Sequence, residues 1–398
     1  MKRITFCQVS TRLINAESSL DLSSQYYESI YTSRDQDGYY KGQDFWEVPL
    51  WIARISKSIP GTWDKVLHVI ESVDDSTKEL SPRDIDYICF SVLDVNKKYI
   101  KEFIEGYSGQ AQIILGGYTD LDDLRQDNVL IFDSIESFVD YLGLKFIPGT
   151  DYSLFKGFKT IPRITLSKGC LFHCKFCTVS DDLELIPDST ILDDAKSFHP
   201  LKFKLVYLDD KTFFQAKNYR ILKQVYKIIK SYNPGFQGFI IQTTCSTVLK
   251  HLSEIKELNI FAIELGIETY NNTLLKALRK PQNEKLILKA MEALAKLGIK
   301  VIPNIIIGII GEDKASYNRT LSLLNGFKEY IYILNIYNLV IYNKTQLSKE
   351  IDINSGNDLN ENSLDKSFYN SKQRKDNAYF YNSIFSVGLK ILSQVLLT

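Results

Sequence analysis

Alternating strand-like and helix-like segments constrain the fold of this chain more than any other feature of its sequence. Short apolar runs rich in isoleucine and valine predict buried strands, and the segments between them have helical periodicity. In the first part of the chain the expected strands are 4–9, 87–90, 113–115 and 129–132, and the expected helices begin near residue 48 and cover 97–107. This order predicts an α/β domain with a doubly wound, Rossmann-like parallel sheet and right-handed crossovers.

The alternation restarts after a proline-containing connector, PGTDYSLFKGFKTIP. Further strands are expected at 163–167, 203–208, 238–244, 260–265, 299–307 and 330–341. Helices are expected at 214–232, 247–257, 271–278, 284–296 and 313–327. Six strand–helix units fit a partial, open (β/α)6 version of the TIM barrel, whose chemistry lies at the carboxyl ends of the strands. The predicted parts are a first domain (1–147), a connector (148–162), a core (163–348) and a short C-terminal helical extension (349–398).

The C-terminal extension has two parts. Residues 352–377 are rich in Asn, Ser, Asp and Lys, which predicts a mobile linker or lid, and this composition is typical of disorder. The final helix carries an apolar stripe that includes Ile384, Val387, Ile391 and Val395. We expect this stripe to pack against the body of the protein, and attachment to a membrane surface is the alternative.

Composition excludes several classes of function. Lys plus Arg equals Asp plus Glu at 48 each, so no overall attraction to nucleic acid is expected. No apolar run reaches the ~18 residues of a membrane span, and the N-terminal MKRITFCQVS resembles a strand rather than a signal peptide. Half of the six cysteines are scattered, which is not a disulfide framework. These features predict a cytoplasmic protein in a reducing compartment.

The main candidates for a functional site are Cys170, Cys174 and Cys177 in the run SKGCLFHCKFCTVS. Soft thiolates select zinc, copper(I) or iron–sulfur, and a cubane iron–sulfur cluster ordinarily takes four cysteines. Three close together, with no fourth nearby, leave one iron open to bind a substrate-like molecule. Structural zinc is the alternative, which needs a fourth ligand. His173 is available, but so short a loop would struggle to close a tetrahedron.

The cysteine run and four later segments resemble the radical S-adenosylmethionine (SAM) superfamily. SKGC is similar to the family's S-R-G-C, with Lys168 in place of arginine. The later segments are LVYLDDKTF, ELGIETYNNTLLKALRK, IIIGIIGED and LVIYNKTQL, which fall in the family's order within residues 161–348. They depart from its pattern at Thr269 (serine), at Ile310 (proline) and at Asn343-Lys344 (Pro-Gly).

This resemblance implies that the three cysteines hold a 4Fe–4S cluster whose free iron is chelated by the amino and carboxylate groups of SAM. The reduced cluster then cleaves SAM to methionine and a 5′-deoxyadenosyl radical, which abstracts hydrogen from a small-molecule substrate. Phe176 is expected beside the adenine. An electron donor such as flavodoxin or ferredoxin is implied as a partner.

Residues of the later segments are the other candidates for binding SAM. Gly308 and Gly311 would let the backbone approach a flat ligand. Glu268 and the Asp209–Asp210 pair would place acceptors near a ribose and a cationic amine. The remaining candidates are Gly266, Thr269 and Glu312. Alternatively, Asp210 caps the helix 214–232 and Glu312 caps the helix 313–327.

The first domain resembles a cobalamin-binding domain of the kind that precedes the radical core in one branch of the family. The similar segments are EVPLWIARIS, DIDYICFSVLDVNKKYIKEFIEG, IILGGYTD and NVLIFDSIESFVDYLG. No D-x-H-x-x-G motif offers a lower axial histidine, a motif that this branch often lacks. The domain therefore either holds cobalamin without a protein ligand or is a remnant. Gly116-Gly117, at a strand end, favours binding.

Three functions follow. The first is a cobalamin-dependent radical SAM methyltransferase acting on a small metabolite or natural-product intermediate. The second is a radical SAM enzyme without cobalamin that catalyses a rearrangement, oxidation, epimerisation or cyclisation. In that case Cys245 could donate a hydrogen atom, although a small buried cysteine is the simpler explanation. The third is a non-catalytic iron–sulfur protein.

Overall fold

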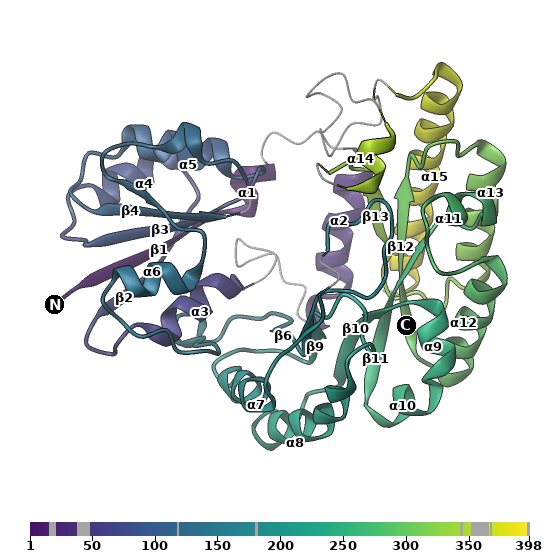
Figure 1. The fold of residues 1–398 in the computed structure, drawn as a ribbon, viewed down its shortest axis with the longest axis horizontal. Helices are drawn as coiled ribbons and strands as arrows, with labels where there is room; N and C mark the ends of the chain where they lie inside the picture. The colour runs from purple at the N-terminus through teal and green to yellow at the C-terminus, as the bar shows by residue number, and fades with distance from the viewer. Residues whose placement is uncertain are drawn as a thin grey trace. The chain divides into compact units, whose positions relative to one another are not determined.

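The computed structural model describes residues 1–15, 21–37, 48–117, 119–179, 182–342, 345–351, 366 and 368–395 (Figure 1). The chain divides into two compact units, each described here by itself. The first comprises Met1–Leu20, Asp37–Pro162 and Leu192–Phe203, and the second comprises Asp21–Gln36, Arg163–Ile191 and Lys204–Thr398.

The first unit is built on a five-stranded sheet in the order β2-β1-β3-β4-β5, in which every neighbouring pair is parallel. Its strands are β1 (Arg3–Val9), β2 (Asp64–Ile70), β3 (Tyr87–Val92), β4 (Gln112–Gly117) and β5 (Val129–Ile131). Its helices include α1 (Thr11–Asn15), α3 (Leu50–Ser58), α4 (Val73–Leu80), α5 (Lys97–Gly106) and α6 (Ile135–Tyr141). The predicted doubly wound domain is confirmed, with the strand order of the flavodoxin type.

Burial explains which strands of this sheet the sequence reveals. The middles of the central strands β3 and β4 are buried, so Ile88–Phe90 and Ile113–Leu115 form apolar runs. The sequence analysis did not identify β2, because β2 is an edge strand whose side chains are mostly half-buried and include Asp64, Lys65 and His68. On α5, Ile100 and Phe103 recur at helical spacing and are fully buried, and Phe103 contacts Phe90 of β3 edge-on, with ring centroids 5.2 Å apart.

The second unit is built on a curled six-stranded sheet in the order β13-β12-β11-β10-β9-β6, again wholly parallel. Its strands are β6 (Arg163–Ile164), β9 (Leu205–Leu208), β10 (Gly238–Thr243), β11 (Ile260–Glu268), β12 (Lys300–Ile307) and β13 (Asn335–Asn338). The helices between them that lie wholly in this unit are α8 (Leu222–Tyr232), α9 (Cys245–Lys250), α10 (Leu252–Glu257), α11 (Asn272–Ala277), α12 (Glu284–Leu297) and α13 (Lys314–Gly326). The helix α7 (Asp188–Ser197) begins in the second unit, and its residues from Leu192 onward belong to the first. The predicted partial barrel is confirmed.

Two barrel strands are shorter than predicted. The strand expected at 163–167 divides into β6 and β7 (Ser167–Lys168), because the N–H of Leu166 donates to the Asp210 carboxylate instead of joining the sheet. The strand expected at 330–341 reduces to β13, preceded by an isolated bridge between Ile331 and Val301. Similarly, the helix expected from 214 starts with a 3-10 turn over Lys217–Ile221.

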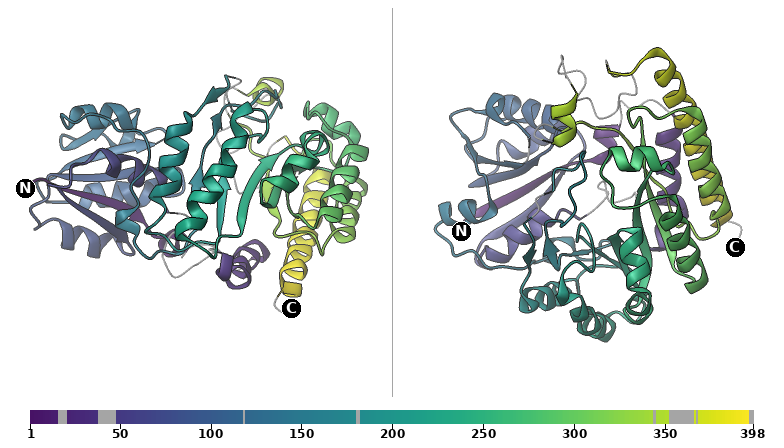
Figure 2. Two further views of the ribbon diagram at one scale, coloured as in Figure 1. Left: turned by 90° about the horizontal axis from the view of Figure 1, so that it is seen from below. Right: turned by 45° about the vertical axis from the view of Figure 1, so that its right-hand side comes forward.

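A helix from each end of the sequence completes the second unit. Figure 2 shows α2 (Leu22–Ser33) beside α15 (Ser371–Val395), although α2 lies within the range predicted for the first domain. Tyr26 of α2 donates to the carbonyl of Leu334 at 2.8 Å and packs on Phe385 of α15. Ile384 and Ile391 are buried, which confirms that the C-terminal stripe packs on the protein itself.

The helix α15 begins at Ser371, inside the segment predicted as a linker, so this end of the segment is helical instead. Residues 352–365 and 367 of that segment lie outside the described residues, as do Asn343 and Lys344. Among the helices that the structure describes, none combines the length and the apolar character needed to cross a membrane.

Candidate functional site

The cysteine loop connects two short antiparallel strands, β7 and β8 (Glu184–Leu185). Backbone hydrogen bonds tie its centre to the segments that follow β11 and β13: the N–H of Lys175 donates to Leu278, and the carbonyl of Lys175 accepts from Leu347. At its start, the amide of Gln215 donates to the carbonyl of Gly169 at 2.8 Å. The loop is therefore held at the carboxyl-terminal edge of the barrel, where the sequence predicts the chemistry.

The three thiols differ in exposure but act on one another. Cys170 is buried with its Sγ 3.3 Å from Thr212 Oγ1, Cys174 is partly buried and Cys177 is exposed. Burial raises the pKa of Cys174 to about 11, opposed by the positive charge of Lys280 and reinforced by the negative charges of Glu268, Cys177 and Cys170. A donor set of thiolates alone, with an ammonium close by, fits an iron–sulfur cluster.

Within the described ranges, no three His, Cys, Asp or Glu side chains converge closely enough to hold one metal ion. A cubane cluster requires its cysteines to be farther apart, since each thiolate binds a different iron.

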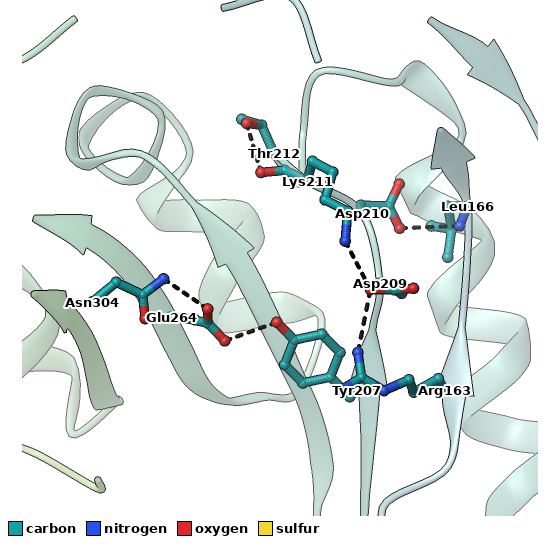
Figure 3. A network of polar contacts seen from close by, with 9 residues as sticks. All are labelled: Arg163, Leu166, Tyr207, Asp209, Asp210, Lys211, Thr212, Glu264 and Asn304. Carbon is teal, nitrogen blue, oxygen red and sulfur yellow. Dashed lines mark hydrogen bonds and ion pairs between the residues drawn. The ribbon is translucent and has the colours of Figure 1, made fainter. Parts of the chain in front are cut away.

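Asp210 supports the base of the cysteine loop. Asp210 is 1% exposed, and its carboxylate accepts from the Leu166 N–H at 3.0 Å (Figure 3). The same carboxylate accepts from the Ser167 hydroxyl at 2.5 Å. Burial raises its pKa, against the effect of these hydrogen bonds. The alternative that Asp210 caps the following helix is wrong, because α8 begins only at Leu222. A contact between Asp210 and SAM stays a prediction.

Asp209 is half-buried and belongs to a different network. It accepts from Arg163 Nη1 and from Lys211 Nζ, both at 3.2 Å (Figure 3). The guanidinium of Arg163 also lies over the ring of Tyr207, 4.5 Å from its centroid. A ligand of Asp209 would therefore share it with two cations of the chain.

Glu268 ends β11 in a left-handed conformation (φ 63°) and forms a buried ion pair with Lys280, whose Nζ lies 2.5 Å from Glu268 Oε1. Gly266 makes room for this pair, because a Cβ there would lie 2.5 Å from Lys280 Nζ. Burial lowers the pKa of Lys280, but the charges of Glu268 and Cys174 outweigh this and raise it. The ammonium lies 5.9 Å from the ring centroid of Phe176.

Lys280 is therefore a further candidate for the site that the sequence analysis missed. A signal was present, since Lys280 closes the run ELGIETYNNTLLKALRK that resembles the family. Phe176 packs against an apolar cluster that contains Leu274, Ile306 and Ile309. An adenine beside Phe176 stays a prediction.

The structure brings together Thr269 and Glu312, which the sequence places in separate segments. The Thr269 hydroxyl donates to Glu312 Oε1 at 2.6 Å, and the Ser316 hydroxyl donates to the same oxygen at 3.2 Å. Glu312 Oε2 is buried without a partner among the described residues, and burial raises the pKa of Glu312 to about 8. Asp313, rather than Glu312, caps α13 by accepting from Ser316 N, so the cap alternative for Glu312 is wrong.

Gly308 and Gly311 both have positive φ (87° and 84°) in the turn between β12 and α13. The closest approach to Gly308 comes from the chain itself: a Cβ there would lie 2.3 Å from the Tyr369 hydroxyl, which donates to the Gly308 carbonyl. Gln373 donates to the carbonyl of Ile309 in the same turn. Contacts with the C-terminal segment thus already require glycine at Gly308, and an approach of SAM stays a prediction.

In the first unit, Gly116 and Gly117 end β4 as predicted. A Cβ at Gly117 would lie 2.1 Å from the carbonyl oxygen of Val92 in β3, so the close packing of these two strands requires this glycine. Leu93 and Val95 follow β3 at the same edge of the sheet and are 47% and 54% exposed. Open parallel sheets bind ligands at this edge.

Comparison with known proteins gives one family and a set of similar structures. Residues 164–324 match the radical SAM superfamily. The fold is similar to the radical S-adenosylmethionine methyltransferase TsrM from Kitasatospora setae, solved with cobalamin and a [4Fe-4S] cluster (TM-score 0.54, 9% identity, 88% of this chain and 78% of TsrM). It is also similar to the cobalamin-dependent S-adenosylmethionine radical enzyme OxsB, solved with aqua-cobalamin and S-adenosylmethionine (TM-score 0.53, 14% identity, 99% of this chain and 56% of OxsB). No curated protein is significantly similar in sequence.

Proposed function

We propose that this chain, whose residues 164–324 match the radical SAM superfamily, is a cobalamin-dependent radical SAM methyltransferase acting on a small metabolite or natural-product intermediate. The observation that carries the proposal is the five-stranded parallel unit, in the order β2-β1-β3-β4-β5, that precedes the barrel strands. TsrM and OxsB, which share this fold, are both solved with cobalamin.

The family implies a 4Fe–4S cluster and SAM, which together supply a 5′-deoxyadenosyl radical by reductive cleavage. Cys170, Cys174 and Cys177 would hold the cluster. The buried pair of Lys280 and Glu268 would present one positive and one negative group beside it, matching the carboxylate and the amino group of SAM. Asp209, Asp210, Thr269, Glu312 and the glycines of the turn would complete the SAM site.

In the first unit, cobalamin would bind at the carboxyl edge of the sheet, between β1 and β3, where the strand order reverses. Exposed Leu93 and Val95 offer apolar surface there for a flat ring. Gly116 and Gly117 keep the adjoining end of β4 free of side chains. An electron donor such as flavodoxin or ferredoxin and a cytoplasmic location belong to the same proposal.

The test is anaerobic reconstitution with iron and sulfide, followed by titration with cobalamin and turnover with methyl-labelled SAM. We expect stoichiometric cobalamin binding and a labelled methyl group in the product. Leu93→Asp should weaken cobalamin binding, whereas Leu288→Asp, at an exposed leucine of α12, should not. Intact SAM cleavage without any cobalamin binding would refute methyl transfer.

A second candidate is a radical enzyme without cobalamin in which Cys245 donates a hydrogen atom to the substrate. Cys245 is fully buried at the start of α9. Burial raises the pKa of its thiol to about 12, and the charges of Lys280 and Glu268 also act on it, so it lies near the cluster loop. Cys245→Ala would abolish or alter the product if this candidate is correct, whereas Cys89→Ala, at a buried cysteine of β3, would not.

A further inference from the structure

One face of the six-stranded sheet packs against helices, and the opposite face carries a group of polar side chains among apolar ones such as Ile240 and Ile302. Phe239 of β10 contacts Tyr226 of α8, with ring centroids 6.4 Å apart. Val206, its register partner on β9, therefore points to the same helix-covered side. Side chains alternate along a strand, so Tyr207 points to the opposite, inner face.

Polar residues continue this inner face across neighbouring strands. Register pairs them as Arg163 with Tyr207, Gln242 with Glu264, and Asn304 with Asn335. Figure 3 shows that Tyr207, Glu264 and Asn304 point toward one another from three different strands. A sheet face that served only as core would carry apolar side chains at these three positions.

Glu264 is the charged centre of this group. It is 7% exposed, and its oxygens accept from the Tyr207 hydroxyl at 2.8 Å and from Asn304 Nδ2 at 2.7 Å. Both donors are neutral, and no described residue places a cation within ion-pair distance of Glu264. The cations on either side are engaged elsewhere, since Arg163 pairs with Asp209 and Lys280 pairs with Glu268.

Asn304 provides a buried hydrogen-bond acceptor beside Glu264. It is 7% exposed, and its Oδ1 is buried with no hydrogen-bond donor among the described residues. A buried carboxylate without a cation and a buried amide oxygen without a donor each cost free energy. One group that carries a positive charge and several N–H donors would relieve both costs.

We propose that Glu264 and Asn304, with Tyr207 orienting the carboxylate, bind the protonated amine of the substrate. An ammonium group has three donors, so it can serve Glu264 and Asn304 Oδ1 together. A hydroxyl would leave the charge of Glu264 uncompensated, and an anionic group would be repelled by it. The substrate class is therefore a small molecule with an aliphatic amine. This inference rests on the proposed radical enzyme that acts on a small molecule.

The position of Glu264 suits substrate rather than SAM. Glu264 lies four residues before Glu268 on β11, which at the rise of a strand is about 13 Å. The amine would thus be held deeper along the strands than the predicted SAM site. A reacting carbon several bonds from the amine would then lie nearer to the cluster loop.

The test uses the full chain, reconstituted with its cluster and saturated with SAM, so that the amino group of SAM already occupies its own site. The probes are n-butylammonium, 1-butanol and butyrate, titrated with detection by saturation-transfer NMR. We expect n-butylammonium to bind at least about tenfold more tightly than either other probe, and Glu264→Gln to remove about tenfold of its affinity. Glu257→Gln, at an exposed glutamate paired with Lys223, should bind like the wild type.

Equal affinity of wild type and Glu264→Gln for n-butylammonium would overturn the inference, as would a failure of the wild type to prefer this probe. If Glu264→Gln does not fold, the affinities of the wild type for the three probes still test the inference. Formation of 5′-deoxyadenosine and uptake of cobalamin are measured on the same preparations. If the wild type neither forms 5′-deoxyadenosine nor takes up cobalamin, the proposed function is refuted. If it does both but shows no preference for n-butylammonium, only the amine site is refuted.

Discussion

The buried carboxyl of Glu312 provides the sharpest test of the candidate site, because its burial predicts a measurable dependence of stability on pH. Its carboxyl is 3% exposed, accepts two hydrogen bonds on Oε1, and has no partner among the described residues for Oε2. Burial raises the pKa of this group from 4.5 to about 8. Glu312→Gln keeps the accepting oxygen for Thr269 and Ser316 and replaces the second oxygen by a neutral amide. The variant therefore resembles the protonated wild type.

The raised pKa of Glu312 determines both the direction and the size of the change in stability with pH. Between pH 4.5 and about 8 the folded wild type keeps a proton that the unfolded chain releases, so its stability falls as the pH rises through this window. At 1.36 kcal/mol per pKa unit the loss is about 3 kcal/mol at pH 7 and about 5 kcal/mol above pH 8. Glu312→Gln has no ionisable group here and should escape this loss.

Urea unfolding at a series of pH values measures the difference. Trp51 and Trp63 lie in the first unit, so their fluorescence reports its unfolding. Far-UV circular dichroism also detects the unfolding of the second unit, which contains Glu312. We expect the free energies of unfolding of variant and wild type to agree near pH 5 and to diverge in favour of the variant up to pH 8.5. Parallel profiles over this range would show that Glu312 is ionised in the folded protein, and the reasoning from burial would fail.

Two further substitutions test contacts that glycines make possible. Gly266→Ala places a methyl group 2.5 Å from Lys280 Nζ. We expect this variant to bind SAM about tenfold more weakly in equilibrium dialysis, a loss of about 1.4 kcal/mol in binding free energy. Gly326→Ala, where the added methyl group would meet nothing within 4 Å, should bind SAM like the wild type. Tyr369→Phe removes a buried 2.6 Å hydrogen bond to the turn between β12 and α13 and should lower the free energy of unfolding by about 1–2 kcal/mol. The exposed counterpart Tyr379→Phe should cost less than about 0.5 kcal/mol, and equal costs would contradict the packing of the C-terminal segment.

Much of the fold could be predicted because its signals are local. The buried strands β3, β4, β11 and β12 read as apolar runs, and the helices between them show their periodicity directly. The edge strand β2 could not be identified because half-buried side chains carry no such run. The membership of α2 in the second unit was also out of reach, since its contacts with Leu334 and Phe385 join residues more than 300 positions apart.

The residues of the candidate site also fall into those that the sequence identifies and those that only the structure identifies. The cysteine triad could be identified because its three thiols lie within a single short loop, so their spacing along the chain indicates the proposed chemistry. Asp210, by contrast, appeared to be a ligand or a helix cap, and only its hydrogen bonds to Leu166 and Ser167 show that it supports the loop. The side chain that fills the space beside Gly308 comes from Tyr369, 61 residues later.

The sequence by itself determined most of the order of strands and helices, the resemblance to the radical SAM superfamily and the three neighbouring thiols, because each of these depends on residues close together along the chain. Only the tertiary structure decided which side chains share the inner face of the barrel. Glu264, Asn304 and Tyr207 come from three strands, and nothing in their local sequence distinguishes them from surface residues. Register and burial place them together, and that placement leaves the buried Glu264 carboxylate with no cation from the described parts of the chain.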